Sequence, residues 1–411
     1  MAPESAEIAA LRALLADPGS PAASDISAEA GHDVASANAV AAALAAVGGA
    51  DADAAFLAAA VGLASAGTGA TYPNPCVGAV VVQAGRVVGA GHSAATGGPH
   101  AEVRALSMAG AAARGATVYV TLEPCSHHGR TPPCTDALIA AGVAEVVFSV
   151  RDPARHAAGR ASAVLTAAGI RVREGVGEAL GASVHEHYLH HEAHRRPFVT
   201  LKAATSLDGR IAAHGGDSKW ITGEPARRVG HWLRARHHAI AVGVDTLLRD
   251  DPRLDVRLVQ GVDPLPVIVD SRLRSALAEP RPQRVRPGTI VLHTEHAPED
   301  RRRRLVDAGL HLLELPADEH DRVAVGPALE ALGRWSIRSL LVEGGGRMLA
   351  SFVAAAAWDR WYWFQAPVLL GDGTPVLPGL AWPTVAQSPR LQVELRISVG
   401  DDDLRVLRPA L

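Results

Sequence analysis

The chain of 411 residues is poor in lysine, cysteine and aromatic residues. Lysine occurs only as Lys202 and Lys219, and 40 basic residues stand against 43 acidic ones, which gives a formal charge of −3. Proteins that bind nucleic-acid phosphates normally carry a basic excess, so this balance argues against a nucleic-acid partner. Three cysteines are too few for a disulfide framework in a chain of this size. They indicate a reducing, cytoplasmic location and leave metal binding or catalysis as their use.

The chain also lacks a long apolar run and a basic leader. No run approaches the roughly 18 to 20 apolar residues of a membrane span, so we expect no membrane association. Acidic residues (Glu4, Glu7 and Asp17) stand where a signal peptide carries positive charge. Hydrophobic residues make up 48% of the chain and charged residues 20%, which is typical of a globular protein, and the length favours two domains.

The first fifty residues contain no aromatic residue and are rich in alanine, serine, glycine and aspartate. We expect a short helix at residues 6–15 within an otherwise low-complexity extension, residues 1–50. Nothing in this segment supplies a metal ligand, a phosphate-binding turn or a core-sized apolar face. The sequence therefore predicts that the extension is dispensable for chemistry.

From residue 51 onward, helical and strand patterns alternate, which predicts two α/β domains, residues 51–195 and 196–411, each with a mostly parallel sheet. In the first domain, helices are expected at 54–66, 100–114 and 133–141, and strands at 77–82, 86–92, 117–123 and 144–150. In the second, strands are expected at 198–204, 239–244, 266–270, 289–294, 339–342, 361–369 and 404–407, and helices at 225–236 and after 346.

A histidine-rich helix is expected at residues 184–196, where histidines stand at 185, 187, 190, 191 and 194. The i,i+4 spacing of two pairs is compatible with a metal site. A polar helix surface at a domain junction explains the pattern equally well, and no HExxH motif accompanies it. We favour the second interpretation.

The sharpest chemical signal is His100-Ala101-Glu102 followed by Pro124-Cys125 and Cys134. One imidazole and two thiolates suit tetrahedral zinc, and a fourth position open to water makes such a site catalytic. Glu102 would lie beside the metal and move protons between water and the leaving amine. A closed structural site is the alternative, with His127, His128 or Cys76 as its fourth ligand.

These residues resemble the zinc nucleoside and nucleobase deaminases, with eight residues between the cysteines in place of the usual two. Three segments, PNPCVGAVVV at 73–82, GGPHAEVRAL at 97–106 and TLEPCSHHGRTPPC at 121–134, resemble the bifunctional riboflavin-biosynthesis deaminase/reductase family. The resemblance implies an α/β architecture: a cytidine-deaminase-like three-layer domain, then a dihydrofolate-reductase-like α/β domain.

For the first domain, the resemblance implies hydrolytic deamination of 2,5-diamino-6-ribosylamino-4(3H)-pyrimidinone 5′-phosphate. One zinc per chain would be held by His100, Cys125 and Cys134, with Glu102 as the proton shuttle and Asn74 at the pyrimidine. Two segments depart from the family pattern and bear on substrate specificity: Gly91-His92-Ser93 replaces Gly-Tyr-His, and Ala154-Arg155-His156 alters a DPNP loop.

For the second domain, no G-x-G-x-x-G follows a strand, which argues against a Rossmann fold. The Glu343-Gly344-Gly345-Gly346 turn instead stands between a strand and a helix, where backbone N–H groups attract anions. This turn and the segments at 199–212, 217–228 and 233–257 resemble the reductase half of the same family. The resemblance implies NADPH-dependent reduction of the ribosyl group to give 5-amino-6-ribitylaminouracil 5′-phosphate.

The resemblance also implies residue roles in the reductase, with Asp250 as the candidate catalytic acid. It places NADPH at Ala204, Trp220, Thr246, Asp250, Gly345, Gly346, Arg347, Met348, Leu349, Ala350 and Ser351. It places the substrate at Lys202, Ser218, Arg234, Leu254, Arg257 and Glu343. The two arginines suit bidentate binding of a sugar phosphate.

Other functions remain open at this point. One half of the chain could be catalytic and the other a non-catalytic binding module, or the enzyme could serve a related pyrimidine pathway. A deaminase of nucleic-acid bases is opposed by the charge balance and by the reductase segments. The expected partners are small phosphorylated pyrimidines and further copies of the chain in a homo-oligomer.

Overall fold

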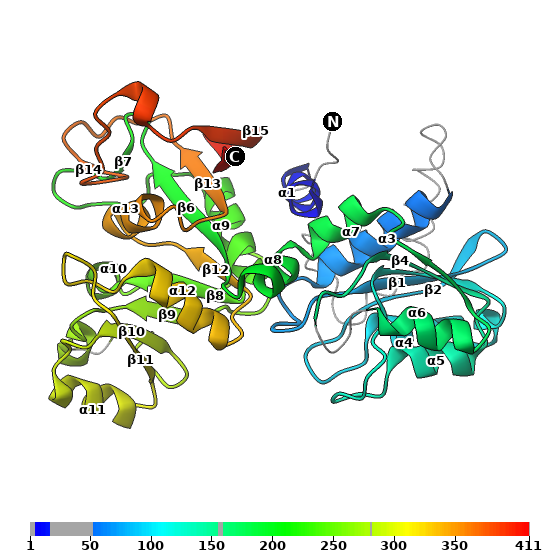
Figure 1. The fold of residues 1–411 in the computed structure, drawn as a ribbon. Coiled ribbons are helices and arrows are strands. Elements are labelled where there is room, and N and C mark those ends of the chain that lie inside the picture. The colour runs from blue at the N-terminus through cyan, green and yellow to red at the C-terminus, as the bar shows by residue number, and fades with distance from the viewer. Residues whose placement is uncertain (1–4, 17–51, 155–158, 280–281, 411) are drawn as a thin grey trace. The chain divides into compact units, whose positions relative to one another are not determined.

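The computed structural model describes residues 5–16, 52–154, 159–279 and 282–410, which form two compact units (Figure 1). The first unit is Met1–Ala193 and the second His194–Leu411, so the division falls two residues before the expected boundary. Within the described residues, no helix is long and apolar enough to cross a membrane.

The first unit is built on a five-stranded sheet in the order β2-β1-β3-β4-β5. Its strands are β1 (Gly78–Gln83), β2 (Arg86–His92), β3 (Thr117–Leu122), β4 (Glu145–Val150) and β5 (Arg171–Glu174). Strands β3, β4 and β5 are parallel, whereas β1 runs antiparallel to both of its neighbours. The expectation of a mostly parallel sheet is therefore wrong for half of the pairings, because β1 and β2 form a hairpin through Ala84 and Gly85, both at positive φ.

Helices cover both faces of this sheet, which confirms the three-layer expectation. One face packs against α3 (Ala52–Gly67), and the other against α4 (Ala101–Ala109), α5 (Cys134–Ala141) and α6 (Arg160–Ala167). The alternation along β1 follows from this arrangement: Val80 faces α3, whereas Ala79 and Val81 face α4.

Two expected helices differ in extent from the expectation. The helix expected at 100–114 ends at Ala109, where Gly110 takes a positive φ of 53° and a short 3-10 turn follows. The helix expected at 184–196 corresponds to α8 (Glu186–His194), and a separate helix that was not expected, α7 (Glu178–Val184), precedes it.

The N-terminal helix α1 (Ala6–Ala16) is part of the first unit. It lies beside α3 and α7 (Figure 1), its Leu11 is fully buried, and the Ala6 N–H donates a 3.0 Å hydrogen bond to Ser183 Oγ. The helix expected at 6–15 is thus present, but describing residues 1–50 as a loose extension is wrong for α1. The rest of that extension, 17–50, lies outside the described residues.

The second unit contains a nine-stranded sheet in the order β11-β10-β9-β8-β12-β6-β13-β16-β15. Neighbouring strands are parallel from β11 to β13, and β16 and β15 add an antiparallel edge. The strands are β6 (Phe198–Thr205), β8 (Ala239–Gly243), β9 (Leu265–Val269), β10 (Ile290–Thr294), β11 (His311–Leu315), β12 (Ser339–Val342), β13 (Arg360–Gln365), β15 (Leu391–Val399) and β16 (Asp402–Pro409). A separate pair joins β7 (Arg210–Ala212) to β14 (Thr374–Pro375).

Helices again cover both faces, so strands such as β8 and β9 contain no polar side chain. In β9, Val267 packs into a core with α12 and α13, whereas the next residue, Ile268, packs against α10 and α11 on the opposite face. The helices are α9 (Glu224–Arg236), α10 (Val244–Asp250), α11 (Glu299–Asp307), α12 (Val325–Arg334) and α13 (Gly346–Ala354).

Candidate active sites

Three side chains from separate elements of the first unit meet at one point. His100 is the residue before α4, Cys125 follows β3 and Cys134 opens α5. The Nδ1 atom of His100 lies 3.2 Å from the sulfur of Cys134 and 3.5 Å from that of Cys125. Their ligand atoms all lie within 4.8 Å of one another, the arrangement expected from the sequence.

The loop between the two cysteines is held to the cluster. The backbone N–H of Cys134 donates to the Cys125 sulfur at 3.2 Å, and the Thr131 hydroxyl lies 3.4 Å from His100 Nε2. Among the described residues, no fourth histidine, cysteine or carboxylate joins the group, so His127, His128 and Cys76 are not placed as ligands. The donor set is therefore that of an open site rather than a closed structural one.

Glu102 is buried beside this cluster at the start of α4. Burial raises the pKa of its carboxyl to about 7, and the negative charge of Cys125 adds to the effect. The pKa of Cys125 falls to about 4, because the thiol of Cys134, the His100 imidazole and a backbone N–H stabilise its thiolate. The pKa of Cys134 is raised by the Cys125 thiolate and by burial. Such coupling is what two thiols and a carboxyl at one site produce.

Asn74 and His92, which the sequence relates to substrate specificity, differ in exposure. Asn74 is exposed, in a turn closed by a hydrogen bond from its N–H to the Thr71 carbonyl at 3.0 Å. His92, in the segment that departs from the family pattern, is buried against α3 at Gly67, and its Nδ1 lies 2.9 Å from the Ser93 carbonyl.

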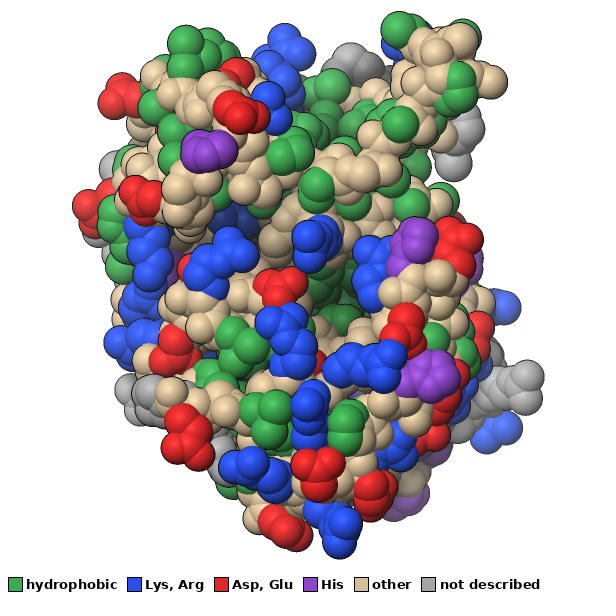
Figure 2. Space-filling model, turned by 90° about the vertical axis from the view of Figure 1, so that its left-hand side faces the viewer, with side chains coloured by type: hydrophobic (Ala, Val, Ile, Leu, Met, Phe, Trp, Pro, Cys, Tyr) green, Lys and Arg blue, Asp and Glu red, His purple; other side chains and the backbone are tan. Residues whose placement is uncertain are grey.

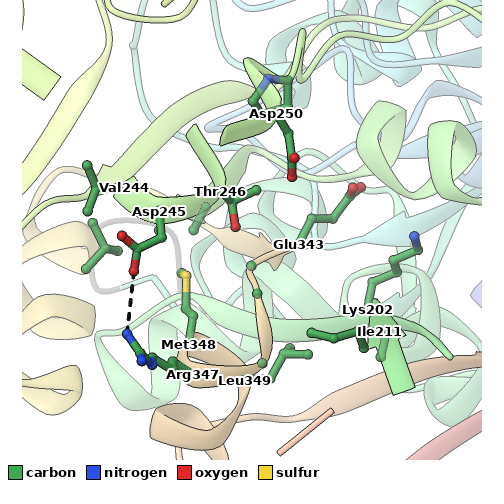
Figure 3. Close-up of a pocket in the computed structure, with 18 of the residues that line it drawn as sticks. Lys202, Ile211, Val244, Asp245, Thr246, Asp250, Glu343, Arg347, Met348 and Leu349 are labelled. Carbon is green, nitrogen blue, oxygen red and sulfur yellow. Dashed lines mark ion pairs between the residues drawn. The ribbon is translucent and has the colours of Figure 1, made fainter. Parts of the chain in front are cut away.

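The second unit contains a cavity of about 1430 Å³ beside the glycine turn. Figure 2 shows a face of the molecule that is hollowed near its middle, with lysine and arginine side chains around the hollow. Figure 3 shows Lys202 of β6, Thr246 and Asp250 of α10, and Glu343 after β12, all of which line the cavity.

Most of the reductase residues expected from the sequence line this cavity. They are Lys202, Ala204, Ser218, Trp220, Arg234, Thr246, Asp250, Arg257, Glu343, Gly345, Gly346, Arg347, Met348, Leu349 and Ser351. Two do not: Ala350 and Leu254 are buried outside the lining. Ala350 lies on the side of α13 that faces the core, because consecutive helical residues point about 100° apart.

A buried ion pair crosses the cavity wall. The Arg234 Nε and Nη2 groups donate to the two Glu343 carboxylate oxygens at 2.9 and 2.8 Å. Burial acts to raise the pKa of Glu343, but the charges of Arg234 and Lys202 outweigh it and lower the pKa to about 2. Burial lowers the pKa of Lys202. Arg234 is thus engaged by a protein carboxylate and by the Asp255 carbonyl, and its binding of the sugar phosphate stays a prediction.

Arg257 lies in a different environment. Its Nη1 donates to Asp255 at 2.6 Å, while Arg253 binds the other oxygen of the same carboxylate at 2.8 Å. The backbone N–H of Arg257 donates to Nδ1 of His231. One carboxylate faces two guanidinium groups, so this part of the wall keeps a positive excess.

The glycine turn is closely packed at Gly346. A Cβ there would come within 2.8 Å of the Pro375 carbonyl oxygen, whereas one on Gly345 would make an ordinary contact of 3.4 Å with Thr246 Oγ1. Gly345 is the residue before α13, so the first N–H groups of that helix have no partner within it and can bind an anion. Arg347 lies 3.8 Å from Asp245 at the same end (Figure 3).

Comparison with known proteins assigns both units. Residues 50–150 match the family model of the cytidine and deoxycytidylate deaminase zinc-binding region, and residues 197–398 match the RibD C-terminal domain. The riboflavin biosynthesis protein RibD of Aquifex aeolicus is 40% identical over 77% of this chain and 87% of its own length. That of Escherichia coli is 39% identical over 84% of this chain and 96% of its own. The chain belongs to the RibD family.

Solved structures of RibD proteins agree with this assignment. One from Acinetobacter baumannii is 35% identical, with a TM-score of 0.79 over 87% of this chain and 99% of its own. One from Thermotoga maritima, described as a diaminohydroxyphosphoribosylaminopyrimidine deaminase/5-amino-6-(5-phosphoribosylamino)uracil reductase, is 34% identical with a TM-score of 0.74 over the same shares. The chain is a bifunctional enzyme of riboflavin biosynthesis, with a zinc-dependent deaminase and an NADPH-dependent reductase.

The residues present fit both groups that a RibD protein uses. One imidazole and two thiolates within 4.8 Å are donors that favour zinc over magnesium or calcium. The large cavity beside a glycine turn that a Cβ would fill suits a dinucleotide phosphate.

Sequence reasoning missed several residues of these sites. Asp255 and His231 arrange Arg257, and the Glu123 carboxylate accepts backbone N–H groups of Asp152, Gly159 and Ala161 beside the altered DPNP loop. Glu123 is buried and stands directly before Pro124-Cys125, so its position next to the cysteine motif was the sequence feature that could have identified it.

Proposed function

We propose that the first unit hydrolytically deaminates 2,5-diamino-6-ribosylamino-4(3H)-pyrimidinone 5′-phosphate. His100, Cys125 and Cys134 would hold one zinc ion, which activates water when bound. The observation that carries this proposal is the buried Glu102 next to three converging ligands. From this position the carboxyl would accept a proton from water and return it to the leaving amine. Exposed Asn74 would contact the pyrimidine.

The second unit would then reduce the ribosyl group of the deaminated product, giving 5-amino-6-ribitylaminouracil 5′-phosphate. NADPH supplies the hydride when bound. The glycine turn, Arg347 and Thr246 would bind this cofactor, and Trp220, which is exposed, offers a flat face at the cavity rim. Asp250, the last residue of α10, would act as the acid, and Lys202 and Glu343 would orient the substrate between them.

The substrate phosphate would bind at Arg257. The positive excess around Asp255 supports this, since Arg234 is already neutralised by Glu343. Arg257→Met should therefore raise the KM for the phosphorylated uracil substrate. Arg234→Met should in addition destabilise the cavity wall, because the buried Glu343 carboxylate would lose its partner. A wild-type KM in Arg257→Met would place the phosphate elsewhere.

The experiment that tests both activities measures ammonia release from the diamino substrate and NADPH consumption with the uracil substrate. Glu102→Gln keeps the size of the side chain but cannot carry the proton, so deamination should fall roughly 10² to 10⁴-fold. Zinc content and NADPH consumption should stay at wild-type levels. Loss of both activities would refute the assignment of one reaction to each unit.

Several expectations stay predictions. They are the assignment of residues 51–195 and 196–411 to the two reactions, the extension at residues 1–50, the homo-oligomeric state and the cytoplasmic location. Sedimentation and cell fractionation would test the last two.

A further inference from the structure

Helix α1 precedes the region matched by the deaminase family model, yet it is packed onto the deaminase unit. Its buried side includes Ile8, Leu11 and Leu14, and it contacts α3 and α7 (Figure 1). The Ala6 N–H, at its first turn, is bound by Ser183 Oγ. The helix therefore has a fixed place on the unit, although it contributes no zinc ligand.

His187 of α8 stands between α1 and a turn of the deaminase. Its Nδ1 lies 2.9 Å from the Tyr72 hydroxyl, and its Nε2 lies 4.0 Å from a carboxylate oxygen of Glu7 in α1. The His187 and Glu7 side chains are only 12% and 8% exposed. The imidazole is thus enclosed, and its two nitrogens face two different parts of the chain.

Tyr72 lies in the turn that carries Asn74, the proposed pyrimidine contact, and this turn is joined to the loop that precedes the metal ligand His100. Thr71 Oγ1 donates to the Asn74 carbonyl at 3.1 Å, which closes the turn. Thr96 Oγ1 lies 2.8 Å from the Thr71 carbonyl and 3.0 Å from that of Tyr72, which joins the turn to the loop that ends at His100. Tyr72 and Asn74 therefore lie in one hydrogen-bonded turn that is tied to this loop.

We propose that Tyr72 and His187 are positioning residues for the pyrimidine substrate, and that α1 is the support that holds them. Helix α1 limits the movement of His187, His187 accepts the hydroxyl hydrogen of Tyr72, and Tyr72 fixes the turn that carries Asn74. This inference rests on the proposed function, because it takes Asn74 as the substrate contact. Tyr72 and His187 act through Asn74 and not on the reacting atoms.

Tyr72→Phe removes one hydroxyl and leaves the ring in place. A single hydrogen bond contributes modestly, so the KM for the diamino substrate should rise about two- to tenfold, with kcat, zinc content and NADPH consumption unchanged. Tyr119→Phe is the matched control, because it removes a hydroxyl in the same unit that donates to Asp53 instead. It should leave KM unchanged.

Variants of His187 and α1 test the remaining two links. His187→Leu should raise KM as Tyr72→Phe does, whereas His187→Asn, whose amide oxygen replaces the Nδ1 acceptor, should restore it. Leu11→Asp places a charge in the buried side of α1 and should give the same rise in KM. Ala13→Asp adds the same charge on the exposed side of the helix and should have no effect.

The double variant Leu11→Asp/Tyr72→Phe decides whether these residues act in one path. If they do, the KM of the double variant should be no higher than that of the more affected single variant. The reason is that the second substitution would remove an interaction that the first has already made ineffective. Multiplied effects, an unchanged KM in Tyr72→Phe, or a fall in kcat and zinc content in place of the rise in KM would overturn the proposal. A wild-type protein that releases no ammonia would instead refute the proposed deamination itself.

Discussion

The ion pair between Arg234 and Glu343 should contribute strongly to the stability of the reductase unit. The guanidinium binds both carboxylate oxygens, and the two side chains are only 15% and 11% exposed. Removing one charge of such a pair costs on the order of 3–5 kcal/mol, because the other is left buried without a partner. In Glu343→Gln, Arg234 and Lys202 both face a neutral amide. The free energy of unfolding of this unit should fall by an amount in that range.

The lowered pKa of Glu343 leads to a similar magnitude for the free energy that this pair contributes to stability. Burial acts to raise this pKa, but Arg234 and Lys202 lower it from 4.5 to about 2. A pKa depressed in the folded state stabilises the protein above the unfolded-state value and ceases to do so as the pH falls through the folded-state value. At about 1.36 kcal/mol per pH unit, this contribution is about 3 kcal/mol at pH 7 and about 2 kcal/mol at pH 3.5.

Tryptophan fluorescence can follow this unit alone, because all seven tryptophans lie between Trp220 and Trp382, within the second unit. Urea denaturation at pH 7 should give a midpoint well below wild type for Glu343→Gln, and the difference should shrink as the pH falls below 4.5. Glu330→Gln is the control, since its pair with Arg334 is exposed and 4.0 Å long, and it should cause no measurable change. Equal midpoints at pH 7, or a difference that does not vary with pH, would refute this reasoning.

Three further outcomes are expected. Cys125→Ser should lower zinc content and ammonia release together, and full zinc occupancy by elemental analysis would show that the ligands are misassigned. Asp250→Asn should slow NADPH consumption and leave ammonia release intact; equal rates would remove Asp250 as the acid. Gly346→Ala, whose Cβ meets a backbone oxygen at 2.8 Å, should weaken NADPH binding in a fluorescence titration, whereas Gly326→Ala, with nothing within 4 Å, should not.

The sequence was sufficient to predict that His100, Cys125 and Cys134 converge, because each stands next to a feature that fixes its place. His100 precedes a helix, Cys125 follows a strand and Cys134 opens a helix, so three short motifs determine the geometry. The parallel order of β11 to β13 was likewise predictable from alternating elements, although β11 itself was missed because only its Leu315 is fully buried. The Ala84-Gly85 turn indicates the hairpin of β1 and β2, but no local pattern indicates that β1 also runs antiparallel to β3.

Charged residues were assigned less well, because their roles depend on partners distant in the sequence. Arg234 and Arg257 look equivalent in the chain, yet Arg234 meets Glu343, 109 residues away, whereas Arg257 meets Asp255 two residues before it. No local pattern distinguishes a guanidinium that is neutralised within the protein from one that retains an excess of charge. Arg257 shares the Asp255 carboxylate with Arg253 and is more exposed than Arg234, which favours it as the phosphate ligand.

The histidine-rich helix also shows that the role of a residue depends on partners distant in the sequence. Its i,i+4 spacing is the pattern of a metal site, but in the described residues its histidines form no metal-binding group. His187 instead meets Tyr72, 115 residues earlier, on one side and Glu7 on the other. What a histidine does is set by the groups that its two nitrogens reach. Here they reach the turn that carries Asn74 and the helix α1, which the sequence predicts to be dispensable. His187 therefore joins elements that lie outside the zinc motif, and no spacing pattern in the sequence indicates that connection.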